Sequence, residues 1–264
     1  MIPLDPIFLP EPAGLHNTGS ICYFNSLLQV LASCTSLHSW ISTSGSELED
    51  RFKEYIVKKF DPMVSTNLLV LLKKRVPTFG NGQESASEAF VLMLNTINSN
   101  SLNNLFIHRF RYNIKCLSCF YTTKLTNDHS MLFEFFGNNE INVQNMLVQK
   151  ILLSDYKCEK CNNIGAVKMS KLTMLPEIIV CLFNVYYEKK IHTFPLFLEF
   201  PGIEKKLRYI IVGQIEHSGN LNGGHYWSRA LRKDGIYLFN DNTFSKSTIE
   251  PTANTYMVIY HLTN

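Results

Sequence analysis

Two pairs of cysteines, each with two residues between its members, constrain the fold more than any other feature of this chain. The first pair is Cys116 and Cys119, and the second is Cys158 and Cys161. Four thiolates in two such pairs can surround one Zn²⁺ tetrahedrally, at roughly 2.3 Å each, and they leave no open coordination position. The sequence therefore predicts a structural zinc site that joins segments separated by residues 120–157. Two redox-active pairs, or unrelated surface thiols, are the alternative interpretation.

The other three cysteines stand alone. Cys34 ends an apolar helical stretch and Cys181 lies in a strand-like apolar run, so both are predicted to be buried, inert thiols. Cys22 differs, because a loop containing Asn, Gly and Ser precedes it and an apolar pattern at helical spacing follows over residues 27–31. We therefore expect Cys22 at or near a helix N-terminus, where the helix dipole and free backbone N–H groups favour a thiolate.

A cysteine nucleophile also needs a basic partner. The candidate is His225, which follows Gly223 and Gly224, two residues that let backbone and substrate approach closely. His217 lies nearby in the sequence and is expected to be structural or to line the rim of the site. The alternative for His225 is an ordinary histidine beside a turn.

The segments around Cys22 and His225 together resemble the ubiquitin-specific protease family, a branch of the papain-like cysteine peptidases. The cysteine segment follows that family's pattern G-L-x-N-x-G-N-T-C-Y-x-N-S-x-L-Q, except at Ser20 and Ile21, where the family has Asn and Thr. The resemblance covers residues 13–261. The matched positions of the cysteine segment are Gly14, Leu15, Asn17, Gly19, Cys22, Tyr23, Asn25, Ser26, Leu28 and Gln29.

This resemblance implies a Cys-His-Asn triad. His225 is the implied general base, and Asn240 is the third member, which orients the imidazole. Asp241 is expected to assist, either by contacting His225 or by anchoring the oxyanion region. Asn17 and the backbone N–H of Cys22 are the implied oxyanion donors. A plain Asn-Asp-Asn turn is the alternative interpretation of residues 240–242.

A segment from residue 83 to residue 90 aligns with the family's Q-x-D-A-x-E-F stretch, which lines the channel for the Arg-containing tail of ubiquitin. Ser85 stands where the family has Asp and Ala89 where it has Phe, so one charge is lost. An ordinary helix N-terminus enriched in Glu is the alternative. The substrate-binding residues implied by the resemblance are Gln83, Glu84, Glu88, Gly224 and Tyr226.

Apolar spacing predicts helices first and strands later, which indicates an α+β fold. The resemblance implies a papain-like cysteine peptidase fold in a single catalytic domain over residues 1–264. Its parts are a helical thumb over residues 10–105, zinc-bearing fingers over 106–175 and a β palm over 176–264. One predicted helix begins at Cys22, and the others cover residues 47–59, 67–75, 84–98 and 143–153. The predicted strands cover residues 106–114, 131–136, 178–187, 207–212, 226–231, 236–239 and 256–261.

Charge and hydropathy exclude several classes of protein. The formal net charge of +3 is small, and Lys and Arg are scattered, so we expect no nucleic-acid partner. No uninterrupted apolar run reaches the roughly 18 residues of a membrane-spanning helix, and the N-terminus resembles neither a signal peptide nor a transit peptide. We therefore expect no membrane partner, and an intracellular location in the cytoplasm, the nucleus or both.

The leading hypothesis is a deubiquitinating cysteine protease that hydrolyses the (iso)peptide bond after the C-terminal glycine of ubiquitin through an acyl-thioester. Its partners would be ubiquitin or ubiquitinated proteins. A protease for another ubiquitin-like modifier is an alternative, favoured by Ser85 and by a short region between Cys22 and the first cysteine pair. An inactive ubiquitin-binding module is a second alternative. A zinc-ribbon scaffold is a third, but it would leave Cys22 and His225 unexplained.

Overall fold

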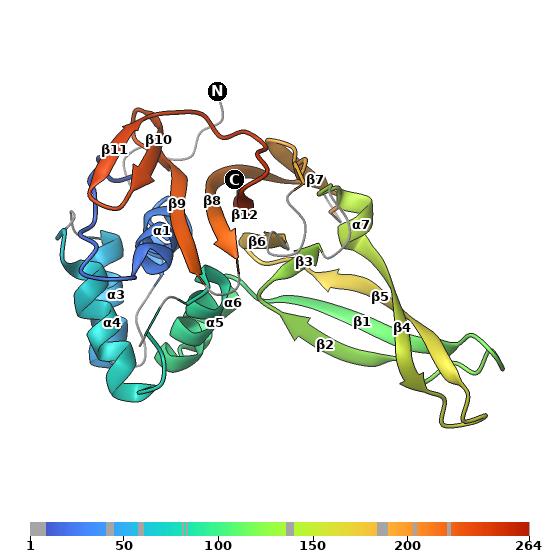
Figure 1. Ribbon diagram of the computed structural model, residues 1–264. Coiled ribbons are helices and arrows are strands. Elements are labelled where there is room, and N and C mark those ends of the chain that lie inside the picture. Colours follow the sequence, from blue (N-terminus) through green and yellow to red (C-terminus); the bar gives the residue numbers. More distant parts are fainter. Residues whose placement is uncertain are drawn as a thin grey trace.

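The computed structural model describes residues 9–40, 45–57, 61–80, 82, 84–135, 140–183, 190–202, 205–220 and 223–263. Within these residues, a series of helices precedes the first strand (Figure 1). None of these helices has an apolar stretch long enough to cross a membrane. The predicted α+β arrangement is confirmed. The helices before the first strand are α1 (Cys22–Leu31), α2 (Thr35–Ser39), α3 (Glu47–Val57), α4 (Val64–Arg75), α5 (Ala86–Ile97) and α6 (Asn100–Asn104).

Four antiparallel strands form an extension that projects from the rest of the molecule, which we call the fingers sheet (Figure 1). The spatial order of its strands is β2-β1-β5-β4. Its two cysteine pairs lie at the ends of β1 and β4 and in the turns that follow them. The strands are β1 (His108–Cys116), β2 (Thr126–Ser130), β4 (Val148–Lys157) and β5 (Ile164–Met174).

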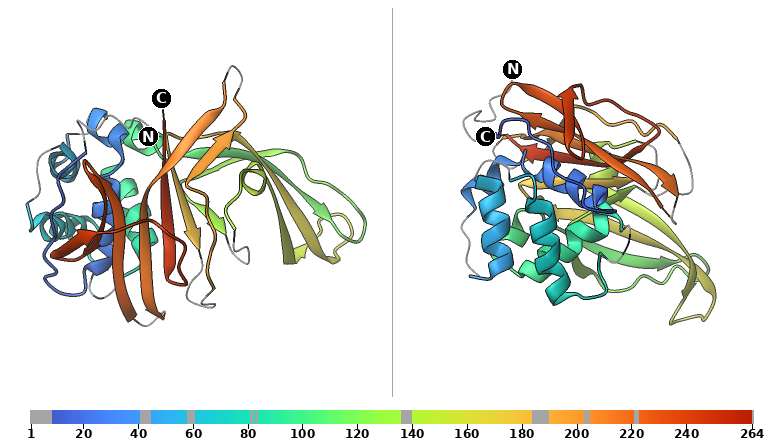
Figure 2. Two further views of the ribbon diagram at one scale, coloured as in Figure 1. Left: turned by 90° about the horizontal axis from the view of Figure 1, so that it is seen from above. Right: turned by 60° about the vertical axis from the view of Figure 1, so that its left-hand side comes forward.

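A second, larger sheet, which we call the palm sheet, has the order β11-β10-β9-β8-β12-β6-β3, and β7 also pairs with β8. All its pairings are antiparallel except that of β3 with β6. Seen from above, helices and fingers sheet lie at opposite ends of the palm sheet (Figure 2). The strands are β3 (Phe133–Phe135), β6 (Ile178–Phe183), β7 (Phe197–Phe200), β8 (Leu207–Asn220), β9 (Gly223–Arg232), β10 (Gly235–Asn240), β11 (Thr243–Lys246) and β12 (Thr255–Leu262).

Helix α1 is the centre of the core, because all its residues are buried. It packs against β8 and β9, and Gly213 of β8 is required there, since a Cβ at that position would overlap the side chain of Val30. At the other end of β9, the buried Arg232 donates to the carbonyl of Gln29 at 3.1 Å and to Ser33 Oγ at 2.9 Å. These contacts fix the helix that begins at Cys22 against the strand that carries the candidate histidine.

The predicted helix over residues 143–153 is wrong in its second half. Helix α7 (Val143–Leu147) ends after five residues, and β4 begins at Val148. Pairing with β5, in which Val148 lies opposite Lys171, outweighs the local helical spacing. The predicted strand over 178–187 is β6 as far as Phe183, and residues 184–187 lie outside the described residues.

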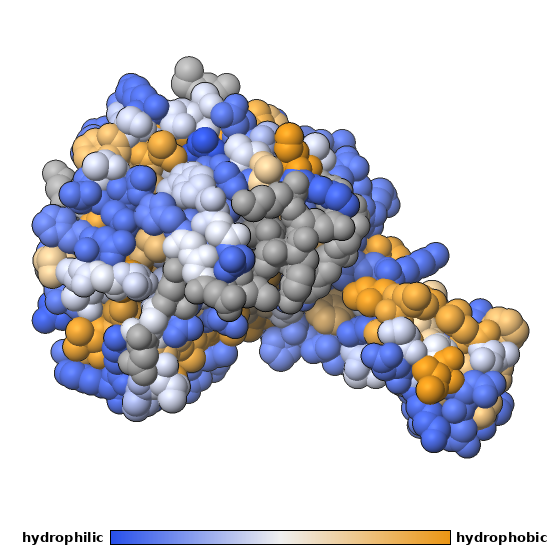
Figure 3. Space-filling view, viewed as in Figure 1, coloured by the Kyte–Doolittle hydropathy of each residue, from blue (hydrophilic) through white to orange (hydrophobic). Residues whose placement is uncertain are grey.

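The fingers sheet exposes many apolar side chains, visible as the orange surface on the projecting part of Figure 3. Leu152 and Ile164 are both 67% exposed. A sheet that leaves so much apolar surface in water obtains little stabilisation from a hydrophobic core of its own. Its tip therefore needs another source of stability, and the four cysteines lie there. The exposed apolar residues of this region are Leu117, Phe120, Leu125, Val148, Ile151, Leu152, Ile164 and Met174.

Candidate active site

The predicted nucleophile and base are brought together by the packing of α1 on β9. Cys22 is the first residue of α1, as expected, and it is 3% exposed. The backbone N–H of Tyr226, next to His225 on β9, donates a hydrogen bond to the Cys22 sulfur. On the neighbouring strand β10, Asn240 Oδ1 lies 2.7 Å from Nε2 of His225. Residues from three distant parts of the sequence therefore meet at one end of the palm sheet.

The pKa of the Cys22 thiol is shifted in the direction opposite to the sequence-based expectation. Burial raises the pKa of its thiol, and this effect outweighs the backbone N–H groups of Tyr226, Tyr23 and Cys22 itself, which act in the opposite direction. The nearby carboxylate of Asp241 raises the pKa further. The helix N-terminus alone therefore does not produce a thiolate here, and a base must accept the proton.

Asp241, the first residue of the turn after β10, does not contact the imidazole in the described hydrogen bonds. Its Oδ2 accepts a hydrogen bond from Asn17 Nδ2 at 3.0 Å, and its Oδ1 accepts one from Asn25 Nδ2 at 2.8 Å. The other end of the Asn17 side chain is also held, because its Oδ1 accepts from the backbone N–H of Gly19 at 3.0 Å. Of the two predicted arrangements for Asp241, the geometry fits the one that anchors the oxyanion region.

Gly14 explains why the segment before Cys22 can lie so close to the turn at residues 241–242. A Cβ on Gly14 would overlap the carbonyl oxygen of Asn242, and the next residue, Leu15, donates its backbone N–H to the carbonyl of Asp241 at 2.9 Å. The segment that leads to Cys22 is thereby fixed to the end of β10.

Gly224, the residue before His225, is a second position where a glycine is needed. A Cβ on Gly224 would overlap Nε2 of His217, which is buried and lies with its ring centroid 4.4 Å from that of Tyr226. His217 is thus a packed residue, in line with its expected structural role. Tyr226 as a whole residue is only 2% exposed, so its ring packs in the core and is not available to a substrate. Gly224 itself is exposed.

The predicted substrate segment forms the N-terminus of α5. Ser85 is its N-cap residue and accepts a hydrogen bond from the backbone N–H of Glu88 at 3.1 Å. Asp and Ser are both good N-cap residues, so Ser85 preserves the helix start although it lacks the charge. Glu84 Oε1 accepts from the backbone N–H of Gly80 at 3.1 Å, and the Glu88 side chain is exposed. Gln83 lies outside the described residues.

The four paired cysteines converge into one cluster, with all four sulfurs within 4.8 Å of one another. Cys116 Sγ lies 3.7 Å from Cys161 Sγ, and Cys119 Sγ lies 3.7 Å from Cys158 Sγ. A tetrahedron of sulfurs at roughly 2.3 Å from a central Zn²⁺ has edges of about 3.8 Å, so the cluster has the size of a zinc site.

The two knuckles have the same backbone geometry, which makes the cluster pseudo-symmetric. Ser118 and Lys160 donate their backbone N–H groups to the first sulfur of each pair, at 3.3 and 3.4 Å. The residues after each pair, Phe120 and Asn162, both have left-handed backbone conformations, with φ of 59° and 60°. The backbone N–H of Cys119 is the main cause that lowers the pKa of the Cys116 thiol to about 6. The backbone N–H of Asn163 lowers the pKa of the Cys161 thiol, but burial and the other three sulfurs outweigh it and raise that pKa to about 12. Such a donor set suits a metal that binds thiolates.

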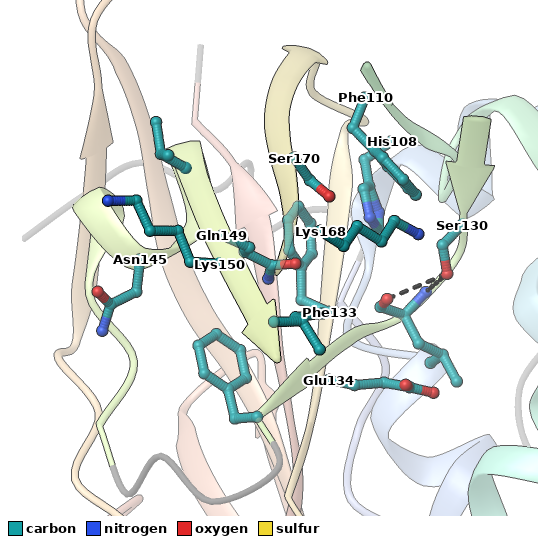
Figure 4. Close-up of a pocket in the computed structure, with 14 residues that line it drawn as sticks. His108, Phe110, Ser130, Phe133, Glu134, Asn145, Gln149, Lys150, Lys168 and Ser170 are labelled. Atoms are coloured by element: carbon teal, nitrogen blue, oxygen red, sulfur yellow. Dashed lines mark hydrogen bonds between the residues drawn. The ribbon is translucent and has the colours of Figure 1, made fainter. Parts of the chain in front are cut away.

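A cavity of about 420 Å³ lies away from these residues, where the fingers sheet meets β3 and α7 (Figure 4). Its wall includes the buried His108, whose ring is stacked 3.7 Å from that of Phe133 and whose pKa is lowered by burial to about 4. The lining residues in the described part of the chain include none from α1, β9 or β10. The cavity is therefore separate from the arrangement around Cys22.

Sequence reasoning missed two residues that hold this arrangement. Asn25 belongs to the matched cysteine segment, but its contact with Asp241 depends on the folded position of β10. Arg232 lies between Leu231 and Lys233, and Arg229 is on the same strand, so the local sequence gives no sign that Arg232 is the buried one.

The architecture, with helices at one end of a palm sheet and a fingers sheet that carries clustered cysteines, has the predicted α+β fold class. A sequence model of the ubiquitin carboxyl-terminal hydrolase family matches residues 13–260. The chain therefore belongs to this family, and the predicted enzyme class is confirmed.

Individual relatives are distant. The chain is 24% identical over 281 residues to ubiquitin carboxyl-terminal hydrolase 11 of Schizosaccharomyces pombe, covering 89% of this chain and 79% of the relative. It is 20% identical over 332 residues to ubiquitin carboxyl-terminal hydrolase 2 of Homo sapiens, covering 95% of this chain but only 55% of the relative. The chain thus spans little more than half of the human protein.

Solved structures share the fold at low sequence identity. The SAGA DUB module Ubp8/Sgf11/Sus1/Sgf73 bound to monoubiquitin contains a chain with a TM-score of 0.71 and 18% identity, over 96% of this chain and 69% of that chain. The same module bound to ubiquitin aldehyde contains one with a TM-score of 0.66 and 19% identity, over 96% of this chain and 70% of that chain. These matches support the fold.

Proposed function

We propose that this enzyme is a deubiquitinating protease that hydrolyses the (iso)peptide bond after the C-terminal glycine of ubiquitin. The observation that carries the proposal is the His225–Asn240 hydrogen bond beside the buried Cys22. Family membership supports the reaction class, and the ubiquitin bound in the similar Ubp8 module supports the substrate.

The hydrogen bond to Asn240 supports one tautomer of His225 in this mechanism. Because the amide oxygen of Asn240 only accepts hydrogen bonds, Nε2 of the neutral imidazole carries the proton. Nδ1 then has a free lone pair and accepts the proton of the Cys22 thiol. Asn240 thus holds the base in the tautomer that the first step requires.

In the first half-reaction the Cys22 thiolate attacks the carbonyl carbon after the last glycine of ubiquitin, and a C–S bond forms. Asn17 Nδ2 and the backbone N–H of Cys22 stabilise the oxyanion, with the Asn17 amide held by Asp241. The C–N bond then breaks, and the His225 imidazolium returns its proton to the departing amine of the lysine. An acyl-thioester and a free amine result.

In the second half-reaction water attacks the thioester carbonyl while His225 accepts a proton from it. The C–S bond breaks, the proton held by His225 passes to the Cys22 sulfur, and the carboxylic acid of ubiquitin leaves and loses its remaining proton to solvent. The chain supplies every group used in both half-reactions.

The remaining assignments follow the family resemblance. Residues 10–105 form the thumb, 106–175 the fingers and 176–264 the palm of one catalytic domain. Zn²⁺, when bound, would supply structural cross-linking through the four cysteine ligands, which leave no position for a substrate. The residues proposed from the resemblance to contact the ubiquitin tail are Gln83, Glu84, Glu88, Gly224 and Tyr226.

The test is reaction of the purified chain with ubiquitin that carries a thiol-reactive group at its C-terminus. We expect a covalent adduct that is lost in Cys22→Ala and retained in the control variant Cys34→Ala, which removes another buried thiol. Parallel probes made from other ubiquitin-like modifiers test specificity. An adduct with another modifier but none with ubiquitin would redirect the substrate, and no adduct with any probe would favour the inactive binding module.

A further inference from the structure

The face of β9 that carries His225 carries a large aromatic residue next to it. Side chains alternate along a strand, so His225 and Trp227 point to the same side. Their ring centroids are 6.2 Å apart and their planes are inclined by only 25°, an offset parallel arrangement. The indole therefore lies alongside the imidazole.

The orientation of Trp227 is set by a buried carboxylate on the adjacent strand. Glu216 lies opposite Trp227 in the pairing of β8 with β9, and it is 1% exposed. The indole Nε1 donates to Glu216 Oε2 at 2.7 Å. The indole N–H is the only hydrogen-bonding group of a Trp side chain, so this bond to Glu216 sets the orientation of the ring.

Glu216 is itself held by two further donors. Arg229 Nη1 lies 2.6 Å from the same oxygen Oε2, and Thr252 Oγ1 donates to Oε1 at 2.7 Å. A buried carboxylate with several donors and an arginine partner is rigid, because losing any of these contacts would leave a charge unsatisfied. The indole is thus anchored to a rigid point in the palm sheet.

His225 needs such a support. Its hydrogen bond to Asn240 lies in an exposed region, and its imidazole must keep Nε2 on Asn240 while Nδ1 serves Cys22. A histidine that is only partly buried can adopt several staggered conformations, most of which break that arrangement. A wall on one side of the ring removes some of these conformations.

We propose that Trp227 is a positioning residue for His225, and that Glu216, held by Arg229 and Thr252, fixes Trp227 in turn. The indole limits rotation of the imidazole, and its π face also attracts the imidazolium that forms when Cys22 loses its proton. Arg229 compensates the charge of Glu216, so the indole and not the carboxylate acts on the ring. This inference rests on the proposed role of His225 as the base.

The first experiment compares Trp227→Ala and Trp227→Phe with the parent chain and with Trp40→Phe, a matched change at the other tryptophan. It measures the rate at which iodoacetamide alkylates Cys22 between pH 4 and pH 9, which requires no ubiquitin. We expect Trp227→Ala to lose the part of the alkylation rate at acidic pH that depends on the thiolate–imidazolium pair. Trp227→Phe, which retains a flat ring, should restore part of it.

Hydrolysis of ubiquitin with a fluorogenic C-terminal group gives the second readout. Misplacement of a catalytic group by about 1 Å can cost roughly a hundredfold, so we expect kcat to fall about tenfold to a hundredfold in Trp227→Ala with KM within twofold. An unchanged alkylation profile and kcat in a folded Trp227→Ala variant would overturn the proposal. If ubiquitin is not the substrate, hydrolysis is absent in every variant, but the alkylation profiles still differ.

Fluorescence gives a measurement that leaves Trp227 itself in place. In Trp40→Phe, Trp227 is the remaining tryptophan, and an imidazolium beside it quenches its emission. We expect quenching on acidification that disappears when His225→Gln is added. Emission that does not depend on His225 would show that the two rings do not interact, and would overturn the proposal.

Discussion

Replacing Asp241 by the isosteric Asn should separate the oxyanion donor from the nucleophile. The two oxygens of Asp241 accept from two different amide groups, those of Asn17 and Asn25, at 3.0 and 2.8 Å. An Asn side chain has one acceptor oxygen and one NH₂ group. In Asp241→Asn, one of the two amide donors therefore faces another donor and must turn away.

The size of the effect follows from these contacts. A hydrogen bond to a charged group contributes roughly 1.5–3 kcal/mol, and Asn17 loses either this bond or its charge assistance. Complete loss of an oxyanion donor lowers kcat by about 10²–10³, or about 2.7–4 kcal/mol. We expect Asp241→Asn to lower kcat between roughly tenfold and a thousandfold, with little change in KM.

The same substitution should act on Cys22 in the opposite direction. The charge of Asp241 raises the pKa of the Cys22 thiol, so removing that charge lowers the pKa and increases the thiolate fraction near neutral pH. Alkylation of Cys22 by iodoacetamide in Asp241→Asn should therefore be at least as fast as in the parent chain. Asp155→Asn, an exposed change on the fingers sheet, is the matched control.

The assay is kcat and KM on ubiquitin with a fluorogenic C-terminal group, measured beside the alkylation rate. A fall in hydrolysis with intact alkylation would support the role of Asp241 in holding Asn17. Wild-type kcat in Asp241→Asn, or parallel loss of hydrolysis and alkylation, would refute the reasoning. Parallel loss would mean that Asp241 acts on the Cys22–His225 pair.

Three further predictions concern the parts that support the site. Cys158→Ser should lower the metal content and the melting temperature, because a structural zinc contributes folding free energy directly; an unchanged melting temperature after verified metal loss would contradict this. Arg232→Met should lower the free energy of unfolding in urea by about 1–3 kcal/mol, since it leaves the carbonyl of Gln29 and Ser33 Oγ without their donor; parent-like stability would contradict the role of Arg232 in holding α1. Ser85→Ala should cost about 1 kcal/mol of stability in the same titration, whereas Ser85→Asp should keep the cap and, if this segment contacts the ubiquitin tail, lower KM.

The sequence predicted those features that depend on local spacing. The start of α1 at Cys22 follows from a polar loop before an apolar helical pattern, and the cysteine cluster follows from two identical x₂ gaps. The helix predicted over the segment from Val148 to Leu153 is wrong, because its apolar residues have helical spacing and only pairing with the distant strand β5 makes it a strand. The apolar spacing within a segment does not indicate which distant strand will pair with it.

The raised pKa of Cys22 shows the same limit in the chemistry. A sequence locates the helix N-terminus, but it does not show how far the thiol is buried or that Asp241 lies near it. The contacts of Glu216 with Trp227 and Arg229 likewise depend on strand register, which the sequence does not specify.

The position of the acidic residue at the end of β10 resolves a conflict between two requirements of the site. An oxyanion donor must be held firmly, and a carboxylate with two acceptor oxygens does this for Asn17 while it also engages Asn25. The same negative charge disfavours the thiolate of Cys22, which burial already disfavours. With Asn240 as the neutral partner of His225, the imidazole is oriented without a second carboxylate beside that thiolate. Among the described residues, only one carboxylate, that of Asp241, therefore disfavours the thiolate of Cys22. In the proposed mechanism, proton transfer to His225 has to overcome this effect and that of burial.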